Sequence, residues 1–329
     1  MTWLLGFIVL VIKIGVMLGA LLLAASYLVW LERKLLARLQ IRLGPNRAGI
    51  FGLLQPIADA VKLLTKEDII PAQADAFIFQ LAPAVVAMTA LLMFAVVPVG
   101  PDLEILGHPV PMVITDLNVG LLYDFALSSL GVYGVALGGW SSNSKFALLG
   151  GIRGAAQMIS YELALGLSLV PVVMLAGSFS LTAIVDAQAR IPFIVLQPVS
   201  FVIFIISAMA ESKRIPFDLP EAENELGAGF HTEYSGMRFG LFFLGEYVHI
   251  QVLGALIAVF FLGGWHGPFL PPPVWLLLKI FVVALIMIWI RGTLPRLRYD
   301  QLMALGWKVL IPVALINIVL TGAVMLWMG

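Results

Sequence analysis

The sequence contains no cysteine and only four histidines among its 329 residues. Without cysteine the chain forms no disulfide and offers no thiolate to an iron–sulfur cluster or to nucleophilic catalysis. Charged residues make up 12% of the chain and the net charge is zero, so the charge balance does not point to nucleic acid. Glycine-rich phosphate-binding loops are absent as well. We therefore expect no catalytic centre of its own, no metal site and no covalently bound cofactor.

Hydrophobic residues, in contrast, make up 61% of the chain. A soluble domain is roughly half apolar and a quarter charged, so here the bilayer must be the main solvent. A span needs about 20 apolar residues and must be helical, because lipid offers no partner to open backbone groups. The sequence therefore predicts an all-α polytopic membrane protein, a single integral membrane domain over 1–329 with about eight transmembrane helices. The expected spans are 3–31, 77–99, 118–140, 155–177, 191–210, 240–263, 275–293 and 306–328. The first run is too long for a signal peptide and is expected to be retained.

Basic residues gather in alternate loops. The segment 32–76 is rich in arginine and lysine. The segments 100–117, 178–190 and 264–274 together contain a single arginine, Arg190, and no lysine. Basic loops stay on the cytoplasmic side of a membrane. Both termini are therefore expected outside, on the periplasmic side of a bacterial plasma membrane; an organelle inner membrane is the less favoured location.

The first cytoplasmic loop contains an amphipathic segment. Phe51, Leu54, Ile57, Val61 and Leu64 recur at intervals of three and four residues, which is the apolar stripe of a surface helix. One interpretation is an interfacial helix lying on the bilayer between basic anchors. A second interpretation is that the helix forms one wall of an amphipathic ligand channel. The two interpretations are compatible.

Acidic residues gather in the third cytoplasmic loop, 211–239, and two more, Glu162 and Glu246, lie within predicted spans. Burying a carboxylate in a membrane is costly, and such groups usually face a polar cavity or a partner. Burial and neighbouring carboxylates raise pKa values, so a row of such groups could exchange protons near neutral pH. The alternative is an ion pair with a basic loop residue. For Glu221 and Glu223 the alternative explanation is structural: a helix would begin at Pro220, and acids in its first turn would interact favourably with the helix dipole. His249 is expected to pack between helices.

Nine segments carry a resemblance to a known family. They are 32–42, Gly44-Pro45-Asn46, 52–59, Lys66-Glu67-Asp68, 157–162, 214–223, 232–236, Gly245-Glu246-Tyr247 and 294–301. Their residues and order resemble the H-type membrane subunit of respiratory complex I, the proton-pumping NADH:quinone oxidoreductase. The mitochondrial counterpart in that family is NADH dehydrogenase subunit 1.

The resemblance implies a subunit that forms most of the tunnel through which ubiquinone or menaquinone, the substrate, enters from the bilayer. It also implies a path of acids that relays quinone chemistry toward proton-pumping subunits. The implied partners are the 49-kDa-type and PSST-type quinone-site subunits, adjacent small membrane subunits and the lipid bilayer, with no nucleic acid. Carried over residue by residue, the acidic path comprises Glu162, Glu211, Glu221, Glu223 and Glu225, and the quinone channel comprises Arg33, Arg42, Asp59 and Phe230.

Two departures from the family pattern stand out. Ser129 takes a position where some members carry an acid, so the path has one carboxylate fewer unless Asp124 takes part. Gly227 replaces a commoner valine and is expected to loosen a helix start. Two other functions remain open: the equivalent subunit of a membrane-bound hydrogenase or of a reduced-deazaflavin- or ferredoxin-dependent complex, and a free-standing ion or solute transporter.

Overall fold

The computed structural model describes residues 3–105 and 108–328. Within these residues seven helices are long and apolar enough to cross a membrane, and a shorter apolar helix, α8, accompanies them. The fold is that of an all-α polytopic membrane protein, as the sequence predicts. The long helices are α1 (Trp3–Leu39), α3 (Ala76–Met93), α4 (Gly120–Ser141), α5 (Lys145–Ala176), α10 (Gly236–Phe261), α11 (Pro272–Thr293) and a last helix that runs as α12 (Tyr299–Ala304), the π-helical turn η4 (Leu305–Leu310) and α13 (Ile311–Met328).

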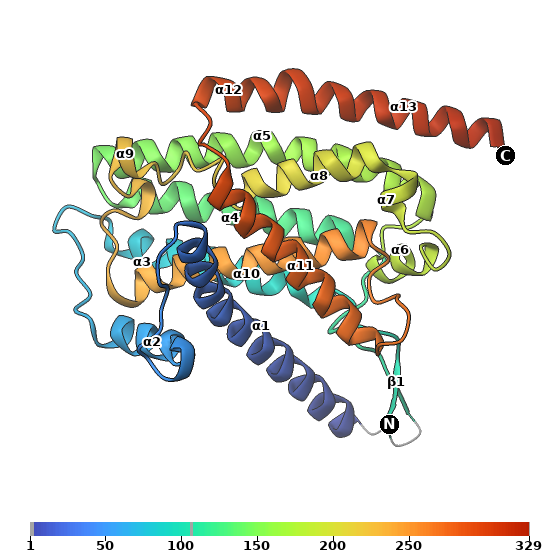
Figure 1. Ribbon diagram of the computed structural model, residues 1–329, viewed down its shortest axis with the longest axis horizontal. Coiled ribbons are helices and arrows are strands. Elements are labelled where there is room, and N and C mark those ends of the chain that lie inside the picture. Colours follow the sequence, from blue (N-terminus) through green and yellow to red (C-terminus); the bar gives the residue numbers. More distant parts are fainter. Residues whose placement is uncertain (1–2, 106–107, 329) are drawn as a thin grey trace.

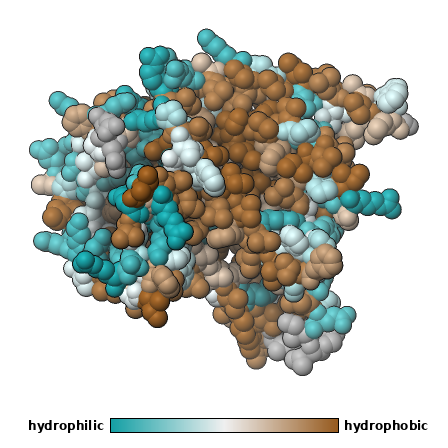
Figure 2. All heavy atoms as spheres, in the orientation of Figure 1, coloured by the Kyte–Doolittle hydropathy of each residue, from teal (hydrophilic) through white to brown (hydrophobic). Residues whose placement is uncertain are grey.

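The two ends of the bundle differ in content (Figure 1). One end holds the first turn of α1, the last turn of α13, the helix α6 (Leu181–Ala187) and an antiparallel hairpin of β1 (Leu103–Ile105) and β2 (His108–Val110). The opposite end holds the short helices α2 (Gln55–Thr65) and α9 (Glu223–Leu226). Figure 2 shows a broad hydrophobic surface between the two ends, with hydrophilic residues concentrated around α2 and α9. This distribution suits a bundle that crosses a bilayer.

The core of the bundle is built around α10, which packs on α3, α1 and α11. The helices approach closely where glycines meet. A Cβ added at Gly139 of α4 would lie 2.4 Å from the carbonyl oxygen of Ala147 in α5, and one added at Gly245 of α10 would lie 2.8 Å from Val86 in α3. Small residues at helix contacts are typical of membrane bundles, because association there depends on close packing.

The fifth predicted span, 191–210, is broken into two helices. A single turn, α7 (Phe193–Leu196), precedes α8 (Pro198–Glu211), and Gln197 between them has non-helical backbone angles. Pro198 suits the first position of the new helix. With 14 residues α8 is about 21 Å long, shorter than the roughly 30 Å hydrocarbon core. Its last residue, Glu211, is therefore buried inside the bundle rather than exposed in a loop.

Several other predicted boundaries were wrong. The first helix continues past residue 31 to Leu39, and α5 begins at Lys145 rather than 155, so Glu32 and Arg33 are helical rather than loop residues. In the third loop the helix begins at Glu223 instead of Pro220. Gly227 ends that helix with φ +75°, a backbone conformation that would be strained for valine. This glycine therefore terminates the helix and does not loosen its start.

The last helix lies along one side of the bundle, on α5 and α8 (Figure 1). Polar contacts hold it there. The amide of Asn317 donates to Gln197 Oε1 at 3.0 Å and to Ser200 Oγ at 2.9 Å, and the Tyr161 hydroxyl donates to the carbonyl of Leu302 at 2.9 Å. These contacts keep α5 and α8, which carry Glu162 and Glu211, in a fixed relation.

Candidate functional site

Arg214 organises a largely buried group of charges just beyond α8. Its guanidinium lies 2.5 Å from Glu32 Oε1 of α1 and 2.6 Å from Glu246 Oε1 of α10, and it stacks over the Tyr247 ring at 4.5 Å. Arg291 of α11 also pairs with Glu32. Arg214 is only 4% exposed, and buried ions are tolerated where they are paired in this way. Glu246 is therefore held in an ion pair with a basic residue of a loop, which was the alternative considered for it.

A second pair of carboxyls, the buried Glu211 and the partly buried Glu162, contacts hydroxyl groups instead of cations. Ser128 donates to Glu211, and its neighbour Ser129 donates to Glu162 of α5. Successive residues of a helix point about 100° apart, so the two serines of α4 serve two different helices. Among the described side chains neither carboxyl pairs with lysine or arginine; the nearest basic group is His249 Nε2, 3.6 Å from Glu211. Ser129, where some members of the family carry an acid, is thus the hydrogen-bond donor to Glu162.

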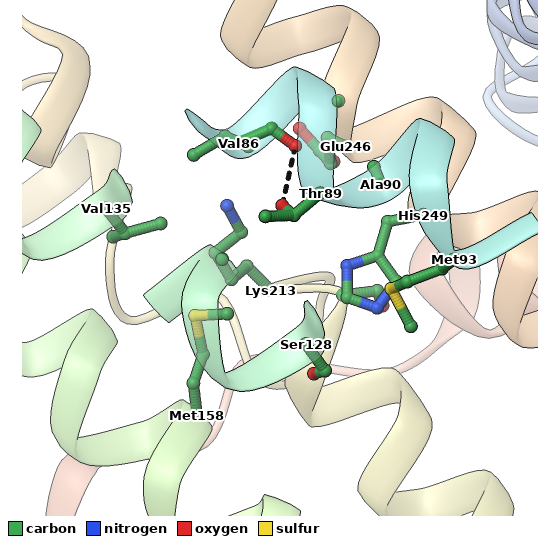
Figure 3. A pocket seen from close by; sticks show the side chains of 13 residues that line it. Val86, Thr89, Ala90, Met93, Ser128, Val135, Met158, Lys213, Glu246 and His249 are labelled. Carbon is green, nitrogen blue, oxygen red and sulfur yellow. Dashed lines mark hydrogen bonds between the residues drawn. The ribbon is translucent and has the colours of Figure 1, made fainter. Parts of the chain in front are cut away.

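A small cavity joins the two groups (Figure 3). It is lined by Glu246 and His249 of α10, by Ser128 of α4 and by Lys213 just beyond α8, and it has a volume of about 20 Å³. That volume is enough for one water molecule, and the lining supplies several polar partners. His249 Nε2 is buried without a hydrogen-bond partner among the described residues. His249 was expected to serve only in packing, yet the fold places it between Glu211 and this cavity.

The acids of the third loop have unlike surroundings. Burial, with the nearby charge of Glu221, raises the pKa of Asp218 to about 7. Burial alone would raise the pKa of Glu221, but a hydrogen bond from His231 and the positive charges of Lys213 and Arg214 hold it below its usual value. Burial also lowers the pKa of Lys213, which lies 4.9 Å above the Phe230 ring.

Glu225 differs from the other acids because its side chain is 54% exposed. Arg153 donates to it at 2.7 Å and Arg296 lies 3.7 Å away. The hydrogen bond from Arg153 holds the pKa of Glu225 below its usual range. This residue is a surface ion pair, which was the alternative to a proton-path role. The side chain of Glu223 lies outside the described part of the structure.

The residues expected along a quinone tunnel fall in two places. Arg33 of α1 donates to Asp59 of α2 at 2.6 Å, so this pair joins the end of the first span to the amphipathic helix. Arg42 is exposed beyond the end of α1. Phe230 lies elsewhere, buried against Phe242 near α4 and α5. The structure therefore brings Arg33 and Asp59 together and separates Phe230 from them.

The amphipathic segment forms α2 with its apolar stripe exposed. Ile57, Val61 and Leu64 are all exposed, while Leu63 contacts α10 at Gly240. Phe51 lies before α2, where its ring and Trp30 both approach the Lys34 ammonium. The exposed stripe fits a helix that lies on lipid or covers a channel.

Some members of the charged groups had no distinct sequence signal. Lys213 and His249 were not assigned to the acidic path, because a lone lysine or histidine beside an apolar span does not reveal what it faces. Their partners lie on other segments of the chain: Glu211 is 38 positions from His249, and Phe230 is 17 positions from Lys213. In the described ranges 3–105 and 108–328, no group of three or more histidine, aspartate or glutamate residues is arranged to hold a metal ion.

Comparison with known proteins places this arrangement in a family. A model of the family described as NADH dehydrogenase matches residues 12–322. The chain belongs to this NADH dehydrogenase family. Among its members, an H subunit of NADH-quinone oxidoreductase from Syntrophobacter fumaroxidans, the one numbered 2, is 74% identical over 329 residues, covering 100% of this chain and 99% of the relative. The H subunit of the same enzyme from Syntrophotalea carbinolica is 62% identical over 326 residues, covering 99% of each. An H subunit from Geobacter metallireducens, the one numbered 1, is 65% identical over 314 residues, covering 95% of each.

Proposed function

We propose that this chain is the membrane subunit of a proton-pumping NADH:quinone oxidoreductase in a bacterial inner membrane. In this proposal it forms the access channel for ubiquinone or menaquinone and couples quinone reduction to proton translocation through an acidic path. The observation that carries the coupling role is the pair of Glu211, which is buried, and Glu162, which is partly buried; both lie between helices and are bonded to serine hydroxyls. The names of the relatives favour this enzyme over a hydrogenase or a solitary transporter.

Hydroxyl partners suit carboxyls that change protonation state. A serine hydroxyl can donate to an ionised carboxylate or accept from a protonated one, whereas an arginine can only donate. A proton can therefore arrive at Glu211 or leave it without breaking an ion pair. The small cavity beside His249 and Lys213 is also lined by Ser128, the hydroxyl partner of Glu211, and the charges of Asp218 and Glu221 in the third loop act on Lys213. Protons and charge would pass along this row.

The quinone role is supported by an apolar cavity of about 780 Å³ between α1, α10 and α11. Its lining is almost wholly hydrocarbon and reaches Trp30 and Leu31. One turn further along α1, Arg33 pairs with Asp59 of α2, and the two supply a polar end. An isoprenoid tail needs the first kind of surface and a quinone head the second. In this proposal Arg42 extends the polar end. Phe230 contributes to the channel indirectly, because the ammonium of Lys213 lies over the Phe230 ring.

Partners must supply the redox centre. With no cysteine, the chain cannot bind an iron–sulfur cluster through thiolates, so the reducing cluster belongs to quinone-site subunits of the 49-kDa and PSST types. The exposed stripe of α2 and the polar end around it offer a surface for these subunits and for lipid (Figure 2). Both termini then lie on the periplasmic side, and adjacent small membrane subunits cover part of the exposed apolar helices.

The test uses the assembled complex in proteoliposomes. We expect Glu162→Gln and Glu211→Gln each to lower quinone reduction and proton pumping about tenfold or more, as for loss of a proton-transferring group. Assembly should persist, since glutamine keeps the serine hydrogen bond. Glu104→Gln, an exposed change in the hairpin, is the matched control. Wild-type rates in both buried variants would refute the acidic path.

A further inference from the structure

Asp124 is a buried acid that the acidic path just described does not use. It lies in α4, is 3% exposed, and both of its carboxyl oxygens are buried without a hydrogen-bond partner among the described residues. An ionised carboxylate left unpaired in such a place would be very costly, and even a neutral one needs a polar partner. Protonation of the carboxyl, a hydrogen-bonded water molecule, or both would remove this cost.

A second cavity supplies the place for that water. It is lined by Asp124, Ser128 and Glu211, with Phe204 and Leu253 among its apolar walls, and its volume is about 20 Å³. One water fits such a space and needs at least two polar partners, which the two carboxyls and the hydroxyl provide. Ser128 also lines the cavity beside His249 and Glu246, so this hydroxyl borders both spaces.

The helix geometry places Asp124 on the same side of α4 as Ser128. The two residues are four positions apart, which corresponds to about one turn and a rise of about 6 Å. Ser129 points elsewhere and serves Glu162. A carboxyl at position 124 thus extends the Glu211 branch of the row toward the end of α4 that begins at Gly120, whereas an acid at position 129 would extend the Glu162 branch.

We propose that Asp124 is a further proton-exchanging residue of this subunit, linked to Glu211 through one water in the cavity that they share. The step is a proton shift only. The Asp124 carboxyl gives its proton to the water, the water gives one of its protons to the Glu211 carboxylate, and the reverse shift restores both groups; no electron moves. The proposal rests on the proposed proton-path function and extends that path beyond Glu211 to Asp124.

The test compares three variants in the assembled complex. We expect Asp124→Asn to lower the coupled pumping rate about tenfold, since asparagine fits the site but carries no exchangeable acid proton. Asp124→Glu, which keeps the acid, should retain most of the rate. Asp186→Asn, an exposed change in α6, is the matched control for loss of a carboxyl. Equal pumping rates in Asp124→Asn and wild type would overturn the proposal.

A spectroscopic readout separates proton exchange from a packing role. Infrared difference spectra recorded on quinone reduction should contain a carboxylic acid carbonyl band that shifts in heavy water and disappears in Asp124→Asn. An unchanged band pattern would overturn the proposal even if the rate falls. Should Asp124→Asn fail to assemble, wild-type and Asp124→Glu complexes are compared, and identical bands in the two count against it.

Glu211→Gln in the same preparations distinguishes this inference from the proposed function. If Glu211→Gln slows pumping and Asp124→Asn does not, the main path stands and the Asp124 branch falls. If neither change has an effect, the acidic path itself falls.

Discussion

Two groups of buried or partly buried carboxyls lie side by side in this bundle, and they differ in what they touch. Glu32 and Glu246 are held by arginines from the third loop and α11. Glu162 and Glu211 are held by the hydroxyls of two serines on α4. The first group joins four segments of the chain through ion pairs, and the second leaves each acid free to bind or release a proton.

The difference teaches that burial alone does not identify a proton carrier. A buried carboxylate locked to a guanidinium would have to break a strong, charge-assisted contact before it could be protonated. A carboxyl that meets a hydroxyl and a water keeps a partner in either state. The arginine-bound acids are therefore expected to matter for stability, and the serine-bound acids for turnover.

The largest effect is expected from Arg214→Met. This change leaves Glu32 and Glu246 as buried charges short of a partner and should cost about 3–5 kcal/mol. The measurement is the yield of assembled complex and its thermal unfolding midpoint. Arg298→Met is the matched control, because its ion pair with Asp300 is exposed. An unchanged midpoint in Arg214→Met would remove the distinction between the two groups.

A smaller effect on the free energy of unfolding is expected from Asp218, and it should depend on pH. Its pKa in the folded protein is raised from the ordinary 3.8 to about 7 by burial and by Glu221, so the folded state holds this proton more tightly than the unfolded chain. The free energy of unfolding should therefore fall as the pH rises from about 4 to about 7, by roughly 1–3 kcal/mol from this group. Asp218→Asn should lack this component.

The measurement is the difference between the unfolding midpoints of wild type and Asp218→Asn across that pH range. It should grow as the pH rises, with the variant the more stable, and level off above pH 7. A difference that stays constant would mean that Asp218 is ionised throughout, like an arginine-paired acid.

The smallest effect on stability is expected from Asp59→Asn. Its partner Arg33 is 44% exposed, and exposed ion pairs contribute about 0–1 kcal/mol. The unfolding midpoint should barely move, whereas the KM for a short-chain quinone should rise if this pair forms the polar end of the channel. A lowered midpoint with an unchanged KM would instead place the pair with the structural group around Arg214.

Sequence reasoning located the membrane segments and the acids better than the helix ends. The apolar runs that form α3, α4, α10 and α11 are long enough to be unambiguous. The run 191–210 read as one span because nearly all its residues are apolar or small, and only the backbone at Gln197 breaks it. Helix starts in the third loop were misplaced for a similar reason: Pro220 suits a first helical position, but the chain turns there first and the helix begins at Glu223.

The sequence by itself determined that this chain belongs in a bilayer and that its acids must face something polar, because composition and run length settle how apolar and ionisable groups partition. Only the tertiary structure decided which acids meet cations and which meet hydroxyls. Glu32 and Arg214 lie 182 positions apart, and Ser128 and Glu211 lie 83 apart. Such contacts depend on how the helices pack and on where α8 ends inside the bundle. No local pattern records either of these.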